Sequence, residues 1–139
     1  MLFRSVNEFI WATETDDSQI QTFLTDHNVD GICATHTGLP WVRTVTNPNG
    51  FWFNVGVLGR PAHEGKRHVY YGCLNFPQHT TRPTPELVPL AYDIDAVTTA
   101  MRLEGLPQEF ITSLEQGVWT TCSEILPTAE KSVQPRVTV

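Results

Sequence analysis

A β-hairpin signature dominates the middle of the sequence. Two runs rich in β-branched and aromatic residues, 41–45 and 51–55, are separated by the turn sequence NPNG. Asn, Pro and Gly favour tight turns, and apolar runs on either side of such a turn pair as neighbouring strands. The apolar run 29–34 precedes the hairpin and predicts a buried strand. It opens into the small and polar segment 35–38, and a loop of this kind at a strand end is where functional side chains are expected.

Capping signals before and after this region predict helices. Capping boxes at 5–8 and 16–19 predict a short helix over 6–12 and a second helix that ends at Asn28. Asp93 is expected to cap a third helix that stops at Gly105.

Pro107 predicts the first helical position of a fourth helix, which ends at Gly117. The segment 118–139 is interrupted by prolines and weakly patterned, and we interpret it as a weakly structured tail.

A further strand is predicted over 67–76. Apolar residues fall on both sides of this segment, which predicts a strand buried on both faces. The prolines that follow predict a loop and an edge strand around 87–92. We therefore expect a mixed sheet built from the strands near 29–34, 41–45, 51–55 and 67–76, with helices on one side.

Composition excludes several function classes. The 139 residues hold 15 acidic and 9 basic side chains, a formal net charge of −6, and 40% hydrophobic residues. This content is typical of a single folded domain, and the scarcity of basic residues argues against nucleic acid as a partner. No apolar run is long enough for a membrane span and no signal-peptide pattern is present, so we expect a cytoplasmic protein without a membrane partner.

Neither the cysteines nor the histidines show a chelating spacing. Three cysteines lie far apart without a C-x-x-C motif, which predicts free, buried thiols. The five histidines form no H-x-x-H or H-E-x-x-H pair. His36 differs from the others because it lies among small residues just after the predicted strand, where a ligand or a metal could approach. The alternative is an ordinary hydrogen-bonded loop histidine.

Two segments around the hairpin resemble known motifs. The run CATHTGLPW at 33–41 and the run FNVGVLGRP at 53–61 resemble the carboxyl-terminal motif pair of calcineurin-like metallophosphoesterases. In that family G-H-T-H-x-P is followed by a hairpin and then by V-N-P-G-S-V-G-x-P. Residues 4–11 resemble the helix after the family's H-G-x-P-x-S segment, and 92–117 resembles the carboxyl-terminal extension of one subgroup.

The match is incomplete in ways that bear on function. His36 matches the first histidine of the family motif, whereas Gly38 replaces the second, as in a subgroup with G-H-T-G-x-P, and Thr35 replaces the leading glycine. The family's amino-terminal ligand motifs, D-x-H, G-D-x-x-D and G-N-H-D or G-N-H-E, have no counterpart in the sequence. The resemblance therefore implies the carboxyl-terminal half of such a domain over 1–139, with His36 as a metal ligand.

This resemblance sets the expected fold and cofactor. The fold class is an α/β layered sandwich fragment, with a mixed sheet and flanking helices, equal to half of the family's αββα fold. Complete family members hold divalent metal (Mn, Fe, Zn or Mg) and hydrolyse phosphomonoesters or phosphodiesters through a metal-activated water. Because a metal site needs several protein ligands and the resemblance supplies one, we expect this chain alone to hold no metal and to be inactive.

Two residues are candidates for substrate contact. Arg60 and His63 lie on the glycine-rich loop after the hairpin and would help to hold the phosphate of an ester substrate. The alternative is that Arg60 pairs with an acidic side chain and that His63 is exposed. Asn54 is expected to tie down the loop backbone instead of contacting substrate.

Two roles for the whole chain agree with the sequence. The first is the carboxyl-terminal part of a phosphoesterase, and the alternative is a catalytically dead family remnant that acts as a binding or interaction module. In both cases an apolar sheet face without its second sheet should associate with the missing amino-terminal half or with another copy.

Overall fold

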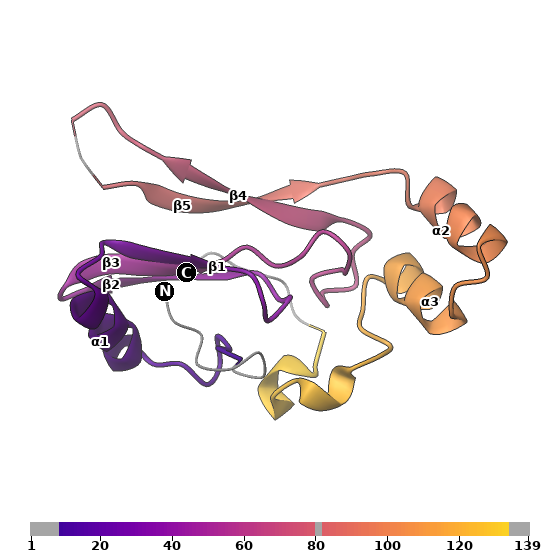
Figure 1. Ribbon diagram of the computed structural model, residues 1–139, viewed down its shortest axis with the longest axis horizontal. Helices are drawn as coiled ribbons and strands as arrows, with labels where there is room; N and C mark the ends of the chain where they lie inside the picture. Colours follow the sequence, from indigo (N-terminus) through magenta and orange to yellow (C-terminus); the bar gives the residue numbers. More distant parts are fainter. Residues whose placement is uncertain (1–8, 80–81, 134–139) are drawn as a thin grey trace.

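The computed structural model describes residues 9–79 and 82–133, which form two sheets, three α-helices and two short 3-10 helices. The elements follow in the order α1 (Asp17–His27), β1 (Gly31–Ala34), β2 (Trp41–Thr46), β3 (Asn49–Asn54), β4 (Val69–Asn75), β5 (Thr84–Leu90), α2 (Ile94–Leu103), α3 (Gln108–Gln116), η1 (Ser123–Ile125) and η2 (Thr128–Glu130). Figure 1 shows them in layers, with the β4–β5 ribbon above the sheet of β1, β2 and β3, and α1 below that sheet. The expected α/β layered sandwich fragment with a mixed sheet and flanking helices is confirmed.

The first sheet is mixed and has the strand order β1-β3-β2. β2 and β3 form the predicted antiparallel hairpin, with Trp41 opposite Asn54 at one end and Thr46 opposite Asn49 at the turn. β1 pairs in parallel with β3, so that Ala34 lies opposite Asn54. The carboxyl ends of β1 and β3 therefore meet at one edge of the sheet, where the loops after both strands begin.

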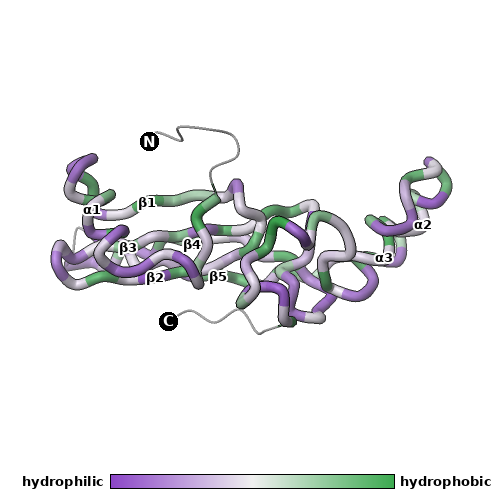
Figure 2. The backbone as a smooth tube through the Cα atoms, turned by 90° about the horizontal axis from the view of Figure 1, so that it is seen from below, coloured by the Kyte–Doolittle hydropathy of each residue, from purple (hydrophilic) through white to green (hydrophobic). Residues whose placement is uncertain are grey.

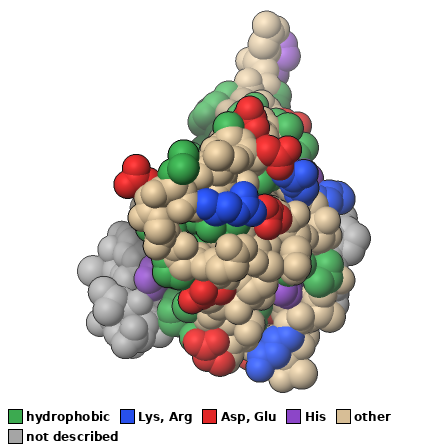
Figure 3. Space-filling model, turned by 90° about the vertical axis from the view of Figure 1, so that its right-hand side faces the viewer, with side chains coloured by type: hydrophobic (Ala, Val, Ile, Leu, Met, Phe, Trp, Pro, Cys, Tyr) green, Lys and Arg blue, Asp and Glu red, His purple; other side chains and the backbone are tan. Residues whose placement is uncertain are grey.

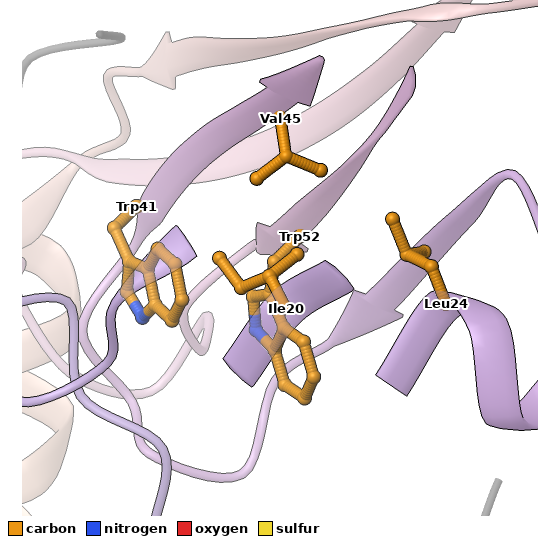
Figure 4. Packing of buried hydrophobic residues seen from close by; sticks show 5 residues of the cluster. All are labelled: Ile20, Leu24, Trp41, Val45 and Trp52. Atoms are coloured by element: carbon orange, nitrogen blue, oxygen red, sulfur yellow. The ribbon is translucent and has the colours of Figure 1, made fainter. Parts of the chain in front are cut away.

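Alternation along these strands buries both faces of the sheet. On one face, Trp41 and Trp52 stack at a ring-centroid distance of 6.0 Å and pack against Ile20 and Leu24 of α1, as Figure 4 shows. The opposite face carries a second cluster, which Leu87 of β5 helps to cover. The buried members of this second cluster are Val42, Phe51 and Phe53.

The placement of β4 corrects the expectation of one continuous sheet. Among the described strands, β4 pairs only with β5, antiparallel, and these two strands form a separate two-stranded sheet. The ribbon packs closely over β3, because a Cβ atom at Gly72 would lie 2.5 Å from the ring of Phe53. The expectation that 67–76 is buried on both faces is wrong, since Tyr71 and Leu74, which lie on opposite faces of β4, are 43% and 39% exposed. The sheet below covers only one side of the ribbon, so apolar residues on both faces do not imply burial on both.

The helices mostly follow their capping signals. Asp16 caps α1 with the predicted capping box, and Asn28 ends the helix in the left-handed region at φ 50°. α2 begins after Asp93, and α3 ends at Gly117 with φ 69°. Figure 1 and Figure 2 both place α2 and α3 at the end of the molecule opposite α1.

The expected helix over 6–12 lies partly outside the described residues, and its described part, 9–12, is not helical. Phe9 and Trp11 stack at 5.5 Å, a contact between i and i+2 that a helix does not allow. Trp11 is instead buried with Leu39, Trp119 and Leu126. Packing against distant residues therefore overrides the local capping signal.

The cysteines are free, as predicted, but none of them is buried. Cys33 and Cys122 are exposed and Cys73 is half-buried. Among the described residues, no helix is long and apolar enough to cross a membrane.

Candidate functional site

The loop after β1 carries His36 and is tied to the loop after β3 by a network of hydrogen bonds. Thr35 Oγ1 donates to the Gly56 carbonyl, and Asn54 Nδ2 donates to Thr37 Oγ1. Asn54 Oδ1 accepts the Gly56 N–H at 3.1 Å, and Asn54 itself is only 1% exposed. The expectation that Asn54 fixes loop backbone is confirmed.

The backbone of this loop turns sharply at His36 and Thr37. The Gly38 N–H donates to the Thr35 carbonyl at 2.9 Å, and Gly38 adopts φ 78°, in the left-handed region that glycine tolerates best. The two residues that flank His36 thus have fixed positions, and His36 itself lies inside the turn. Because hydrogen bonds hold this loop, a side chain on it can keep its position while it stays exposed to solvent.

His36 itself is exposed at the rim of this loop. Its imidazole lies parallel to the ring of Phe9, with ring centroids 5.0 Å apart and an interplanar angle of 5°. The stacking contact fixes the plane of the imidazole on one side. The sequence-based role of His36 as a metal ligand stays a prediction.

The described residues do not by themselves form a complete metal site. Within 9–79 and 82–133, no group of three or more His, Cys, Asp or Glu side chains is arranged to hold a metal ion. Structural and catalytic metal sites use three or four protein ligands at fixed geometry. His36 would therefore need ligands from outside the described part of the chain, and we derive no metal-dependent step from these residues.

Arg60 is half-buried on the loop after β3 and is held in a fixed orientation. Its guanidinium carbon lies 4.0 Å from the ring centroid of Trp119. Arg60 Nη2 donates to the Thr121 carbonyl at 2.6 Å and to Thr121 Oγ1 at 2.9 Å. No described carboxylate forms an ion pair with Arg60, so the pairing with an acidic residue that the sequence left open is not found there.

His63 is buried, contrary to the alternative of an exposed histidine, with 5% of its surface accessible. Its Nδ1 accepts the backbone N–H of Trp119 at 2.8 Å, and its Nε2 lies 3.0 Å from the Lys131 carbonyl. Because Nδ1 accepts, Nε2 must carry the hydrogen and donate. Both ring nitrogens are therefore engaged by main chain. A contact of His63 with substrate remains a prediction.

Trp119 joins the predicted site residues, and sequence reasoning missed it. Its indole N–H donates to the Pro61 carbonyl at 2.8 Å, and a Cβ atom at Gly38 would lie 2.9 Å from its ring. The loops of His36, Arg60 and His63 thus all meet one indole. A tryptophan in an otherwise weakly patterned segment was the available signal, since large aromatic side chains are highly buried on average. The interpretation of 118–139 as a tail stays a prediction.

The described contacts of the remaining histidines are made with residues other than Trp119 and the three candidate site residues. His27 is exposed and packs beside Phe23 at 6.4 Å. His68 is half-buried with Nε2 2.8 Å from Glu64 Oε1, and His79 is exposed.

Comparison with known proteins places this arrangement in a known fold. No protein-family model matches the sequence, and no curated protein matches it. The crystal structure of a metallophosphoesterase from Sphaerobacter thermophilus matches with a TM-score of 0.50 at 22% identity, over 65% of this chain and 44% of its own. The chain has the fold of part of a metallophosphoesterase.

A second solved structure is similar over more of the chain. It is a hypothetical protein from Pyrococcus horikoshii OT3, with a TM-score of 0.57 at 16% identity, over 75% of this chain and 39% of its own. The chain thus spans about two fifths of the length of the two solved structures. At these identities the likeness concerns the fold.

Proposed function

We propose that this chain is the carboxyl-terminal portion of a metal-dependent phosphoesterase domain that hydrolyses phosphomonoesters or phosphodiesters. One observation carries the proposal: the chain shares its fold with a metallophosphoesterase, and the loop after β1 displays His36. The resemblance of residues 33–41 and 53–61 to the family's motif pair supports the same assignment. In this proposal, His36 supplies one ligand to a divalent metal, such as Mn, Fe, Zn or Mg, and the amino-terminal half of the domain supplies the others.

The chain alone is inactive in this proposal. Its partner is the amino-terminal half, and a phosphate ester is the substrate of the complete domain. The alternative proposal is a catalytically dead remnant that serves as a binding module. It rests on the sequence, which lacks counterparts of the family's amino-terminal ligand motifs.

A complementation assay tests the proposal. The chain, alone and mixed with an amino-terminal metallophosphoesterase segment that carries the missing ligand motifs, is assayed with Mn²⁺ for hydrolysis of bis(p-nitrophenyl) phosphate. We expect no hydrolysis by the chain alone and hydrolysis by the mixture. His36→Ala should lower the rate of the mixture by at least about 100-fold, because losing a direct metal ligand costs no less than losing a residue that only orients one.

His79→Ala is the matched control, because His79 is also exposed but lies on the loop between β4 and β5. It should leave the rate within about twofold, as is usual for surface substitutions. Equal hydrolysis rates for His36→Ala and the unsubstituted chain would show that His36 is not a metal ligand of the complemented domain. A mixture that binds tightly but never hydrolyses the ester would favour the binding module.

A further inference from the structure

Arg60 differs from the other described arginines in its charge environment. Each of the others lies within ion-pair distance of a carboxylate, and Figure 3 shows acidic side chains beside basic ones on one face of the molecule. These pairs are Arg43–Asp17, Arg67–Asp95, Arg82–Asp30 and Arg102–Glu115. In a chain of net charge −6, a half-buried arginine without a described acidic partner is an exception that calls for another anion.

The guanidinium of Arg60 is oriented before any ligand arrives. It lies over Trp119, and Thr121 takes both of its described hydrogen bonds through Nη2. Nε and Nη1 make no hydrogen bond within the described part of the chain. A planar guanidinium with free N–H groups matches the oxygens of a phosphate, and stacking removes part of the entropy cost of binding.

The surface beneath Arg60 is itself rigid. Trp119 donates its backbone N–H to His63 and its indole N–H to Pro61, and the ring of His63 is held in turn at the Lys131 carbonyl. Trp119 is 5% exposed, so these hydrogen bonds lie away from competing water. The carboxyl-terminal segment is thereby fastened to the loop after β3.

The same indole supports the loop of His36. A Cβ atom at Gly38 would lie 2.9 Å from Cζ2 of Trp119, and Gly38 is two residues beyond His36. One ring thus contacts Arg60 across its face and the backbone of the His36 loop along its edge. A cation and the candidate metal ligand are held on two loops by one shared support.

We propose that Arg60 binds a phosphate group, and that Trp119 and Thr121 are the positioning residues that orient its guanidinium. The identification of that phosphate as part of an ester substrate rests on the proposed function, whereas binding of the anion itself does not. The segment 118–121 then belongs to the site.

Phosphate binding is tested by NMR on the full chain. Inorganic phosphate and the non-hydrolysable phenylphosphonate are titrated while the Arg60 Nε–H and Trp119 Nε1–H signals are followed in ¹⁵N correlation spectra. We expect saturable shifts of both signals with either anion. Arg60→Gln should weaken binding by at least about tenfold, the loss of one charge-assisted contact, and Arg60→Lys should restore only part of it.

Arg102→Gln is the matched control, because Arg102 already pairs with Glu115 on the helical hairpin. It should leave the affinity unchanged. Trp119→Phe keeps a ring under Arg60 but removes the hydrogen bond to Pro61, so it should shift the Arg60 signal and weaken binding by less than Arg60→Gln. If Trp119→Phe unfolds the chain, Arg60→Gln still decides, because Arg60 is only half-buried.

The outcomes separate this proposal from the proposed function. Affinity that falls with Arg60→Gln but not with His36→Ala supports the anion site whether or not the complemented domain hydrolyses an ester. The anion-site proposal is overturned if no saturable shifts occur, or if Arg102→Gln lowers the affinity as much as Arg60→Gln does. Arg60 would then only hydrogen-bond Thr121 and hold that segment in place.

Discussion

The side-chain hydrogen bonds of this protein include short-range bonds within a helix end and bonds that join residues far apart in the chain. Asp16 accepts the N–H of Gln19 at 2.9 Å, three residues away, and Asn28 closes the same helix. The partners of His63 and Arg60, in contrast, lie 56 and 61 residues along the chain. Periodicity and capping rules concern residues that are near neighbours in the chain. They therefore do not predict which distant residues hold His63 and Arg60 in place.

Asp16 provides a prediction at the residue scale. Its hydrogen bonds with Ser18 and with the Gln19 backbone lower the pKa of its carboxyl below the ordinary 3.8. A folded-state pKa below the unfolded one stabilises the fold above the unfolded pKa, and this stabilisation is lost as the pH falls through the folded pKa. We therefore expect acid to weaken the fold partly through Asp16.

Asp16→Asn should flatten the fall in urea midpoint between pH 7 and pH 3, because Asn still caps the helix but does not titrate in this range. Asp26→Asn, near the other end of α1, is the control and should not flatten it. An identical pH dependence for Asp16→Asn and the unsubstituted chain would contradict the assignment.

At the scale of elements, helices and the hairpin were predicted well and strand partners were not. α1, α2 and α3 each begin and end within about two residues of their signals, because caps and stops are local. The β2–β3 turn likewise lies inside one short segment. The partner of β4 depends on which surfaces meet across the molecule, and the sequence placed it in the wrong sheet.

Two glycines at helix ends give a matched prediction. Gly105 and Gly117 follow α2 and α3 with nearly equal φ, 68° and 69°. A Cβ atom at Gly105 meets no atom within 4 Å, whereas one at Gly117 would lie 2.3 Å from the Lys66 carbonyl oxygen. Both alanine substitutions carry the left-handed strain, and only Gly117→Ala also collides with main chain.

We expect Gly105→Ala to lower the free energy of unfolding by about 1 kcal/mol. Gly117→Ala should cost about 3 kcal/mol, since the Lys66 backbone must shift as well. Urea unfolding of the two variants side by side measures the difference. Equal losses of unfolding free energy would mean that the Lys66 backbone can move away from the added methyl group at no cost.

At the scale of the whole molecule, exposed apolar side chains lie on the β4–β5 ribbon and also on α2 and α3. α1 and the ribbon cover the two faces of the β1-β3-β2 sheet, so that sheet is not the uncovered surface. Tyr71 and Leu90 are each 43% exposed, and by strand alternation they share the face of the ribbon that points away from the sheet. Both edges of a two-stranded ribbon are also open to further pairing.

We expect the isolated chain to self-associate through this face as its concentration rises. The double variant Tyr71→Lys and Leu90→Lys should lower the mass measured by light scattering toward that of a monomer. Leu103→Lys is the control, because Leu103 is 83% exposed on α2 and lies outside the ribbon. A chain that is strictly monomeric at every concentration would contradict the expectation.

Local signals in the sequence predict the hairpin and the capped helices, and the resemblance of its motifs to a known family predicts the fold class and singles out His36. Only the tertiary structure separated β4 from the first sheet, buried His63, and brought Trp119 beneath Arg60 and beside Gly38. The physical reason is the distance along the chain over which each interaction acts. Turn and capping energies act between neighbours in the chain, whereas stacking and burial depend on which distant surfaces exclude water together.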